Sequence, residues 1–256
     1  ARTSTPCFTH CPGAVTPPRA GDLRERPGTC CRRWRAWRAT PGFGWAIATW
    51  QRTSGEPASC RLVFPFRRSP QSLRGGMSDD PVPTQVQTDE GELAFQAYFV
   101  REQCRPQVRG FRFQGVDQAR LQPELKALCT GESLAGVIIC PSNPFVSIDP
   151  MLQLDNFWQS LRECAVKVVA VAPIVAGQAL KGPAAKMLAE LGLPVTALGV
   201  AEHYARHYPG LVTTFVLDHS DATLAPEIAA LGMEVQVRST IMRERAAKQA
   251  LANDCL

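Results

Sequence analysis

Short apolar runs and longer amphipathic segments alternate along the C-terminal two-thirds of the chain. The short runs are rich in β-branched residues, and the longer segments repeat apolar residues at helical spacing. Strands are predicted at residues 82–88, 108–113, 137–140, 166–172, 195–200, 212–217 and 233–237. Helices are predicted at residues 91–104, 122–129, 150–164, 183–191, 201–208 and 221–231, and from a Ser239-Thr240 cap to about residue 252. This alternation predicts an α/β fold with a mostly parallel sheet and right-handed crossovers.

Two neighbouring apolar runs, at residues 137–140 and 166–172, predict a pair of buried parallel strands. Both runs are short, β-branched and ended by proline. Open α/β sheets bind ligands at the carboxyl ends of their strands. The loops that follow these two runs are therefore the predicted binding site.

The loop after the first run offers polar groups on a chain stiffened by proline. Ser142 supplies a hydroxyl and Asn143 an amide, and both lie between Pro141 and Pro144. Ser147 adds a second hydroxyl a few residues later. These groups can hydrogen-bond a phosphate or a sugar, although an S-N-P tripeptide by itself is commonly only a turn.

Three charged residues complete the predicted site. Asp149, followed by proline, predicts the N-cap of a helix whose free backbone N–H groups suit a phosphate. Lys181 ends a flexible turn that begins at Gly177, and Lys186 lies one turn into the next helix. Asp149 has the alternative of being a cap alone, and a single lysine is commonly a solvated surface charge. Their position after two buried strands favours binding.

The length of 256 residues suffices for one large α/β domain or two small ones. No apolar run is long enough to cross a membrane, and no secretory signal is recognised, so a cytoplasmic protein is expected. None of the ten cysteines forms a C-x-x-C pair and only four histidines occur, so a zinc site is not predicted. Cys140 and Cys164 are predicted to be reduced thiols of the core, which fits the same compartment.

Charge divides the chain sharply. Residues 1–76 hold 13 Arg, no Lys and 3 acidic residues, a net charge of +10, whereas residues 77–256 carry −5. A basic arm is typical of nucleic-acid binding, which stays an alternative for residues 1–76. The acidic remainder has no such footprint.

Residues 1–76 do not have the pattern of a folded domain. Proline and glycine interrupt every candidate helix, and no apolar periodicity persists. A disordered basic tail is one interpretation, but four of the five Trp lie here, which is unusual for disorder. A shifted reading frame is the other. Codons read from the third base across residues 41–53 permit W-F-R-L-G-D-R-D-L-A-T-H-L, and the same offset across residues 1–11 permits P-D-L-D-T-V-L-Y-T-L.

Residues 77–251 resemble the CofD-like 2-phospho-L-lactate transferase and phosphoenolpyruvate transferase family of coenzyme F-420 biosynthesis. The resemblance is carried by M-S-D-D-P-V-P-T from Met77, D-E-G-E-L from Asp89, I-C-P-S-N-P-F-V-S-I-D-P from Ile139, K-G-P-A-A-K-M from Lys181, E-L-G from Glu190, and V-A with H-Y from Val200. The segment from Ile139 is the strongest match. The two shifted-frame strings also resemble family segments that precede M-S-D-D-P.

The resemblance implies a Rossmann-like three-layer α/β/α domain, often a homodimer. It implies transfer of a phospho-enolpyruvyl or 2-phospho-L-lactyl group from a guanylyl-activated donor to the deazaflavin Fo, with release of GMP and help from Mg²⁺; bacterial members are similar to phosphoenolpyruvate users. The chemistry of such a transfer suits Lys181 and Lys186 to neutralising diphosphate oxygens, although the resemblance assigns that role to neither lysine individually. Asp149 is a cap alone, or helps to hold the metal or a ribose hydroxyl. Asp79 and Asp80 are metal or acceptor contacts, or simply a turn. His203 and Tyr204 are expected to pack a helix.

The sequence departs from the family before residue 77. Family members begin with a strand and a Gly-rich phosphate loop, and no G-G-T-G element occurs here. We therefore expect residues 1–76 to be out of frame and disordered, residues 77–256 to be the C-terminal portion of the family domain, and this chain to be inactive. A nucleotide-sugar-binding regulatory protein of the same superfamily is the alternative. The residues leave open the three-carbon acid, the metal ligands and the oligomeric state.

The frame interpretation predicts an insertion or deletion in the coding DNA between the codons for Thr53 and Met77. Sequencing genomic template from upstream of Ala1 tests this, because correcting the indel should join one long open frame to residue 77. Genomic DNA that encodes the printed sequence, without an insertion or deletion between the codons for Thr53 and Met77, would contradict the interpretation.

Overall fold

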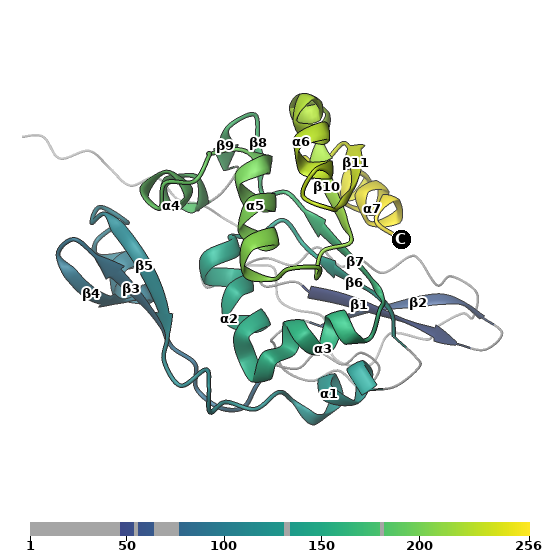
Figure 1. Ribbon diagram of the computed structural model, residues 1–256, viewed down its shortest axis with the longest axis horizontal. Coiled ribbons are helices and arrows are strands. Elements are labelled where there is room, and N and C mark those ends of the chain that lie inside the picture. The colour runs from purple at the N-terminus through teal and green to yellow at the C-terminus, as the bar shows by residue number, and fades with distance from the viewer. Residues whose placement is uncertain (1–46, 54–55, 64–76, 131–133, 180–181) are drawn as a thin grey trace, which may run out of the picture. The chain divides into compact units, whose positions relative to one another are not determined.

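The computed structural model describes residues 47–53, 56–63, 77–130, 134–179 and 182–256, and the side chains from residue 77 onward. All of them belong to one unit, Trp34–Leu256. Two kinds of sheet organise this unit, a six-stranded sheet and a separate small antiparallel sheet (Figure 1). The part of the chain that the structure describes contains no helix long and apolar enough to cross a membrane.

The six-stranded sheet has the order β11-β10-β7-β6-β1-β2. Its four parallel strands are β6 (Leu134–Ile139), β7 (Lys167–Val171), β10 (Thr214–Asp218) and β11 (Glu234–Arg238). Parallel strands that are covered on both faces are typically rich in Val and Ile, as β6 and β7 are. The predicted α/β class with a mostly parallel sheet is confirmed.

Alternate residues of these strands face two different cores. One core contains Val137, Ile139, Val168, Ala170, Phe215 and Leu217, together with Leu152, Leu161, Leu188, Val200 and Ile228 from the helices of that face. The other contains Ile138, Val169, Val171 and Val216, with Leu251 and Cys255 from the C-terminal helix. The period of two along each strand thus places helices on both faces, and the three-layer arrangement is confirmed.

The helices lie between the strands along the chain. They are α1 (Pro123–Thr130), α2 (Asp149–Gln153), α3 (Phe157–Glu163), α4 (Ala184–Glu190), α5 (Ala197–His207), α6 (Ala225–Ala229) and α7 (Arg245–Asp254), with a 3₁₀ segment η4 (His219–Leu224) before α6. In Figure 1, α5 and α2 lie over one face of the sheet, and Leu251 of α7 packs against the other face.

Two strands lie within residues 1–76, where the sequence predicts none. β1 (Ile47–Thr53) pairs antiparallel with β6 and with β2 (Glu56–Val63). Main-chain pairing satisfies the free edge of β6 whatever the side chains are, which explains why a segment without periodicity can join the sheet. Residues 1–46, 54–55 and 64–76 lie outside the described residues, and the out-of-frame origin of this region stays a prediction.

The predicted helix at 91–104 is wrong in its first part. Residues Gly91–Ala94 form β4, in a small antiparallel sheet with β3 (Thr84–Thr88) and β5 (Val108–Phe113). Only residues 95–101 of the predicted segment are helical, and most of them form the short π-helix η1 (Ala97–Arg101). The Thr88 hydroxyl donates to the Gly91 carbonyl at 2.6 Å and accepts from the Glu90 N–H at 3.2 Å. This tight turn reverses the chain into a hairpin before a helix can begin.

The predicted helix at 150–164 is broken. A π-turn η2 (Pro144–Ile148) leads into α2, and a 3₁₀ segment η3 (Leu154–Asn156) separates α2 from α3. Asp155 and Asn156 take left-handed backbone conformations, with φ of 48° and 53°. Asp and Asn tolerate that region better than other non-glycine residues, so the chain turns there without glycine.

Residues 195–200 are not a strand but enter α5. Thr196 is the N-cap, and its hydroxyl accepts from the Gly199 N–H at 3.3 Å. A short apolar run is compatible with either structure, and here the cap decides it. Likewise, α7 begins after Glu244 instead of at the Ser239-Thr240 cap, because the Thr240 N–H and hydroxyl both donate to Asp218, at 2.9 and 3.1 Å.

Gly199 should resist substitution, because a Cβ atom there would lie 2.1 Å from the Pro194 carbonyl oxygen. Alanine normally stabilises a helix relative to glycine by about 1 kcal/mol. We expect Gly199→Ala instead to lower the free energy of unfolding by about 1–3 kcal/mol, measured by urea denaturation. Arg206→Ala, on the exposed side of the same helix, should change it by less than about 0.5 kcal/mol. A Gly199→Ala protein as stable as the parent would show that this close approach is absent.

Candidate functional site

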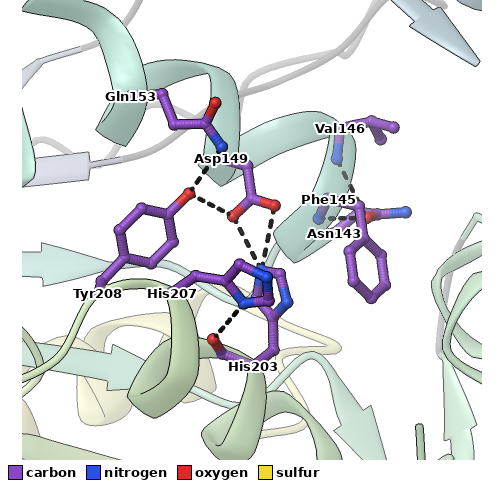
Figure 2. Close-up of polar contacts among 8 residues, drawn as sticks. All are labelled: Asn143, Phe145, Val146, Asp149, Gln153, His203, His207 and Tyr208. Carbon is purple, nitrogen blue, oxygen red and sulfur yellow. Dashed lines mark hydrogen bonds and ion pairs between the residues drawn. The ribbon is translucent and has the colours of Figure 1, made fainter. Parts of the chain in front are cut away.

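The loop after β6 begins a helical segment that Asn143 caps. The Asn143 side-chain oxygen accepts from the backbone N–H groups of Phe145, at 3.0 Å, and Val146, at 3.4 Å (Figure 2). Pro144 takes the first helical position, where its missing N–H costs nothing. The prediction that Asp149 is the N-cap is therefore wrong: the helical segment starts six residues earlier, and the Asp149 N–H is already bonded to the Pro144 carbonyl.

Asn143 also joins this loop to the helix after the lysine turn. Its amide N–H₂ donates to the Met187 sulfur of α4 at 3.2 Å. The ring of Phe145 stacks on Phe111 of β5, with 5.6 Å between centroids. The structure thus brings together the loop after β6, the start of α4 and the small sheet.

Asp149 is buried and accepts hydrogen bonds from His203 of α5 and from Tyr208, the residue that follows this helix. Its oxygens lie 2.9 and 3.0 Å from Nε2 of His203, and Oδ1 also accepts from the Tyr208 hydroxyl at 2.9 Å. Gln153 donates to the same hydroxyl at 3.3 Å (Figure 2). Burial and then the Asp149 carboxyl raise the pKa of Tyr208, so this phenol stays a donor across the accessible pH range. The contact ties α2 to α5.

His203 has a second feature. Its Nδ1 atom is buried and has no hydrogen-bond partner among the described residues. The ring meets the edge of Phe145 at 4.8 Å and lies 4.5 Å from the His207 ring, whose Nδ1 bonds the His203 carbonyl. His203 therefore packs its helix, as the sequence predicts, but also holds Asp149. The two H-Y pairs, four residues apart on one helix face, were the signal for this cluster.

The remaining predicted site residues have different surroundings. Ser142 is half-buried, and its hydroxyl makes no hydrogen bond to a described residue. Ser147 is buried, and its N–H donates to the Asn143 carbonyl at 3.0 Å. Lys181 lies outside the described residues.

Lys186 is held in place by its neighbours. Its ammonium donates to the Pro106 carbonyl at 3.0 Å and pairs with Glu190 one turn later. Glu190 in turn accepts from the Val108 N–H at 3.0 Å. These hydrogen bonds connect α4 to β5, so within the described structure Lys186 stabilises the contact between the two elements.

The M-S-D-D-P segment forms a turn fixed at long range. The Ser78 hydroxyl donates to the Arg120 carbonyl at 2.7 Å, and Asp80 accepts from the Arg120 N–H at 2.9 Å. Asp79 is exposed. Of the two interpretations of Asp79 and Asp80, the geometry supports the turn for Asp80.

Sequence reasoning missed two acidic residues, Asp218 at the end of β10 and Asp221 shortly after it. Burial disfavours ionisation of Asp218, but hydrogen bonds from the N–H and hydroxyl groups of Ser220 and Thr240 outweigh it and lower the pKa of this carboxyl. Asp221 accepts from the Ala176 N–H at 3.0 and 3.2 Å and so fixes the turn between β8 (Ile174–Val175) and β9 (Gln178–Ala179). Both carboxyls organise the loops at the same sheet edge.

The fit of these residues to a metal ion is poor. Among the described residues, no group of three or more His, Cys, Asp or Glu side chains could hold a metal. The carboxylates of Asp149, Asp218 and Asp221 each accept hydrogen bonds from groups of the protein.

The Asp149 contact makes a stability prediction. Asp149→Asn would place an amide N–H₂ against groups that donate, and we expect the free energy of unfolding to fall by about 1–3 kcal/mol. Urea denaturation at neutral pH measures it. Asp117→Asn, at an exposed position of the same residue type, is the control and should change stability by less than about 0.5 kcal/mol. Equal effects at the two positions would show that Asp149 does not join the helices.

Comparison with known proteins agrees with this geometry. The profile of the family described as 2-phospho-L-lactate transferase CofD matches residues 76–251. A 2-phospho-L-lactate transferase of Methanosarcina mazei is 35% identical over 176 residues, 69% of this chain and 55% of that one. One from Halobacterium salinarum is 41% identical over 148 residues, 57% of this chain and 41% of that one.

Among solved structures, a member of the upf0052 family from Bacillus halodurans is similar at a TM-score of 0.49 and 11% identity, covering 71% of this chain and 61% of that one. This likeness is too low to carry an argument. The chain spans about half the length of the two transferases. Because the family profile covers more than half of the chain, including the loop after β6 and helices α4 and α5, the chain belongs to the CofD 2-phospho-L-lactate transferase family.

Proposed function

We propose that the complete protein of which this chain carries the C-terminal part is a transferase of coenzyme F-420 biosynthesis. It moves a phospho-enolpyruvyl or 2-phospho-L-lactyl group from a guanylyl-activated donor to the ribityl hydroxyl of the deazaflavin Fo, and GMP leaves. The observation that carries this proposal is the family match over residues 76–251, which includes every described residue of the candidate site.

The chemistry suits a site of this kind. Transfer between phosphate esters needs positioning and charge neutralisation more than a covalent nucleophile. The loop after β6 is rigid, because Asn143 caps it and bonds Met187 of α4. A rigid loop at the carboxyl edge of parallel strands is where α/β proteins hold nucleotides.

We propose separate roles for the predicted site residues. Ser142 has a hydroxyl without a partner among the described residues, and we assign it, with Lys181, to direct contact with the anionic donor. Asn143 and Asp149 are positioning residues. Their side chains bond to Met187, His203 and Tyr208 instead of to the substrate.

The two remaining predicted residues are assigned to support. Ser147 is buried in the capped segment, and Lys186 is paired with Glu190. Both residues therefore support the shape of the loop and of α4. A direct contact of the Lys186 ammonium with a diphosphate would first require the ion pair between Lys186 and Glu190 to break.

The family resemblance also supports proposals that concern the whole protein. We propose that the reaction uses Mg²⁺, that the active protein is a cytoplasmic homodimer, and that this chain as written has no turnover. The last proposal is supported by the match beginning at residue 76 and by the absence of a G-G-T-G element from the printed sequence.

A direct assay compares this chain with the protein encoded by the longer in-frame gene. Each is incubated with Fo, Mg²⁺ and a donor formed in place from GTP and either phosphoenolpyruvate or 2-phospho-L-lactate. The longer protein should release GMP and give a product whose mass identifies the acid, and this chain should give neither. Turnover by this chain would overturn its inactivity. UDP-sugar binding without turnover by the longer protein would favour the regulatory alternative.

In the longer protein, Ser142→Ala should reduce kcat/KM by about 10- to 100-fold with little change in stability, as expected for one lost hydrogen bond to a charged group. Ser160→Ala removes the same hydroxyl from α3, away from the loop, and should leave kcat/KM unchanged. An unaffected Ser142→Ala enzyme would remove Ser142 from the site.

A further inference from the structure

A cavity of about 210 Å³ opens between α1 and α3, which lie side by side in Figure 1. Two cysteines line it: Cys129 in the last turn of α1, and Cys164 directly after α3. Lys126, Asp155 and Glu163 contribute charged groups to the wall, and Leu121 contributes an apolar part. Both cysteines are free thiols and half-buried.

The two thiols are neighbours. The Cys164 thiol donates to the Cys129 carbonyl at 2.6 Å. Burial raises the pKa of Cys129 to about 12, and the adjacent Cys164 thiol raises it further in the same direction. Burial also raises the pKa of Cys164, but a hydrogen bond from the Cys129 thiol opposes the rise. The pKa of each thiol is therefore raised overall, and the contact between the two thiols adds to the rise at Cys129 and opposes it at Cys164.

We propose that Cys129 and Cys164 are an oxidation site that forms a reversible intramolecular disulfide with a hydroperoxide. The Cys164 thiolate attacks the peroxide, an S–O bond forms as the O–O bond breaks, and one water or alcohol leaves. The Cys129 thiol then attacks the Cys164 sulfur and gives up its proton as the S–S bond forms, and the sulfenic oxygen leaves as water. The two thiols lose two electrons to the peroxide, and their two protons end in the leaving groups.

The position of the pair sets the consequence. The cysteines are 35 positions apart and bracket β6, the loop after it, α2 and α3. They lie at the amino ends of β6 and β7, because Cys129 precedes β6 and Cys164 precedes β7, whereas the loop after β6 lies at the carboxyl end. A disulfide here would close a long loop and stabilise the fold without entering the candidate site.

Treatment of the reduced full chain with stoichiometric hydrogen peroxide tests the proposal. Trypsin digestion without reductant should give peptide 127–162 joined to peptide 163–167, and dithiothreitol should separate them. Because peptide 127–162 also contains Cys140, the joined peptide must persist in Cys140→Ser and disappear in both Cys129→Ser and Cys164→Ser. Oxidation should proceed faster as pH rises, since it needs thiolate.

A second measurement keeps the proposal falsifiable without any variant. Peroxide treatment should raise the midpoint of thermal unfolding of the parent chain by about 5 °C or more, reversed by dithiothreitol. Cys129 and Cys164 recovered only as separate sulfinic acids or unmodified thiols, with no joined peptide, would overturn the proposal. A joined peptide that persists in Cys129→Ser would place the disulfide between Cys140 and Cys164 and overturn it as well.

Discussion

The buried contact between Asp149 and α5 fixes the arrangement of the whole candidate site. Asp149 begins α2, and its carboxyl receives Nε2 of His203 and the hydroxyl of Tyr208 at distances of 2.9 to 3.0 Å. A buried polar group of this kind is costly unless every partner is in place, so α2 and α5 have little freedom relative to each other. The loop after β6 leads directly into α2, so its movement is restricted as well.

The same principle recurs along the carboxyl edge of the sheet. Asp218 gathers the Ser220 and Thr240 donors, and Asp221 fixes the turn between β8 and β9 through the Ala176 N–H. Each loop at this edge is thus held by one buried or nearly buried side chain from a neighbouring element. The two cores fix the register of the strands at this edge. A shift of a strand by one residue would move the side chains of each core to the opposite face of the sheet.

The sequence predicted what local patterns determine. The strands at β5, β6, β7 and β10 come from short β-branched runs, and the helices between them come from apolar periodicity, so the α/β class followed. It failed where a long-range hydrogen bond decides the structure. Thr240 has the pattern of a helix cap but donates to Asp218, 22 residues earlier, and Asp149 has the pattern of a cap but accepts from α5, more than fifty residues later.

Other differences have a local cause that the pattern did not reveal. Residues 195–200 are apolar enough for a strand, and the Thr196 hydroxyl bonded to the Gly199 N–H commits them to a helix. The left-handed pair Asp155 and Asn156 divides a segment whose apolar spacing is continuous. Ser142 and Asn143 were predicted together from the S-N-P loop, and the separate roles that we propose for them rest on their hydrogen bonds, which the sequence does not reveal.

The most direct test of the account is a crystal structure of the longer in-frame protein with GMP, the proposed leaving group. The account predicts that the GMP phosphate lies at the loop after β6, within hydrogen-bond distance of the Ser142 hydroxyl, while Asp149 keeps its bonds to His203 and Tyr208. A phosphate bound elsewhere, with the loop after β6 empty, would contradict it.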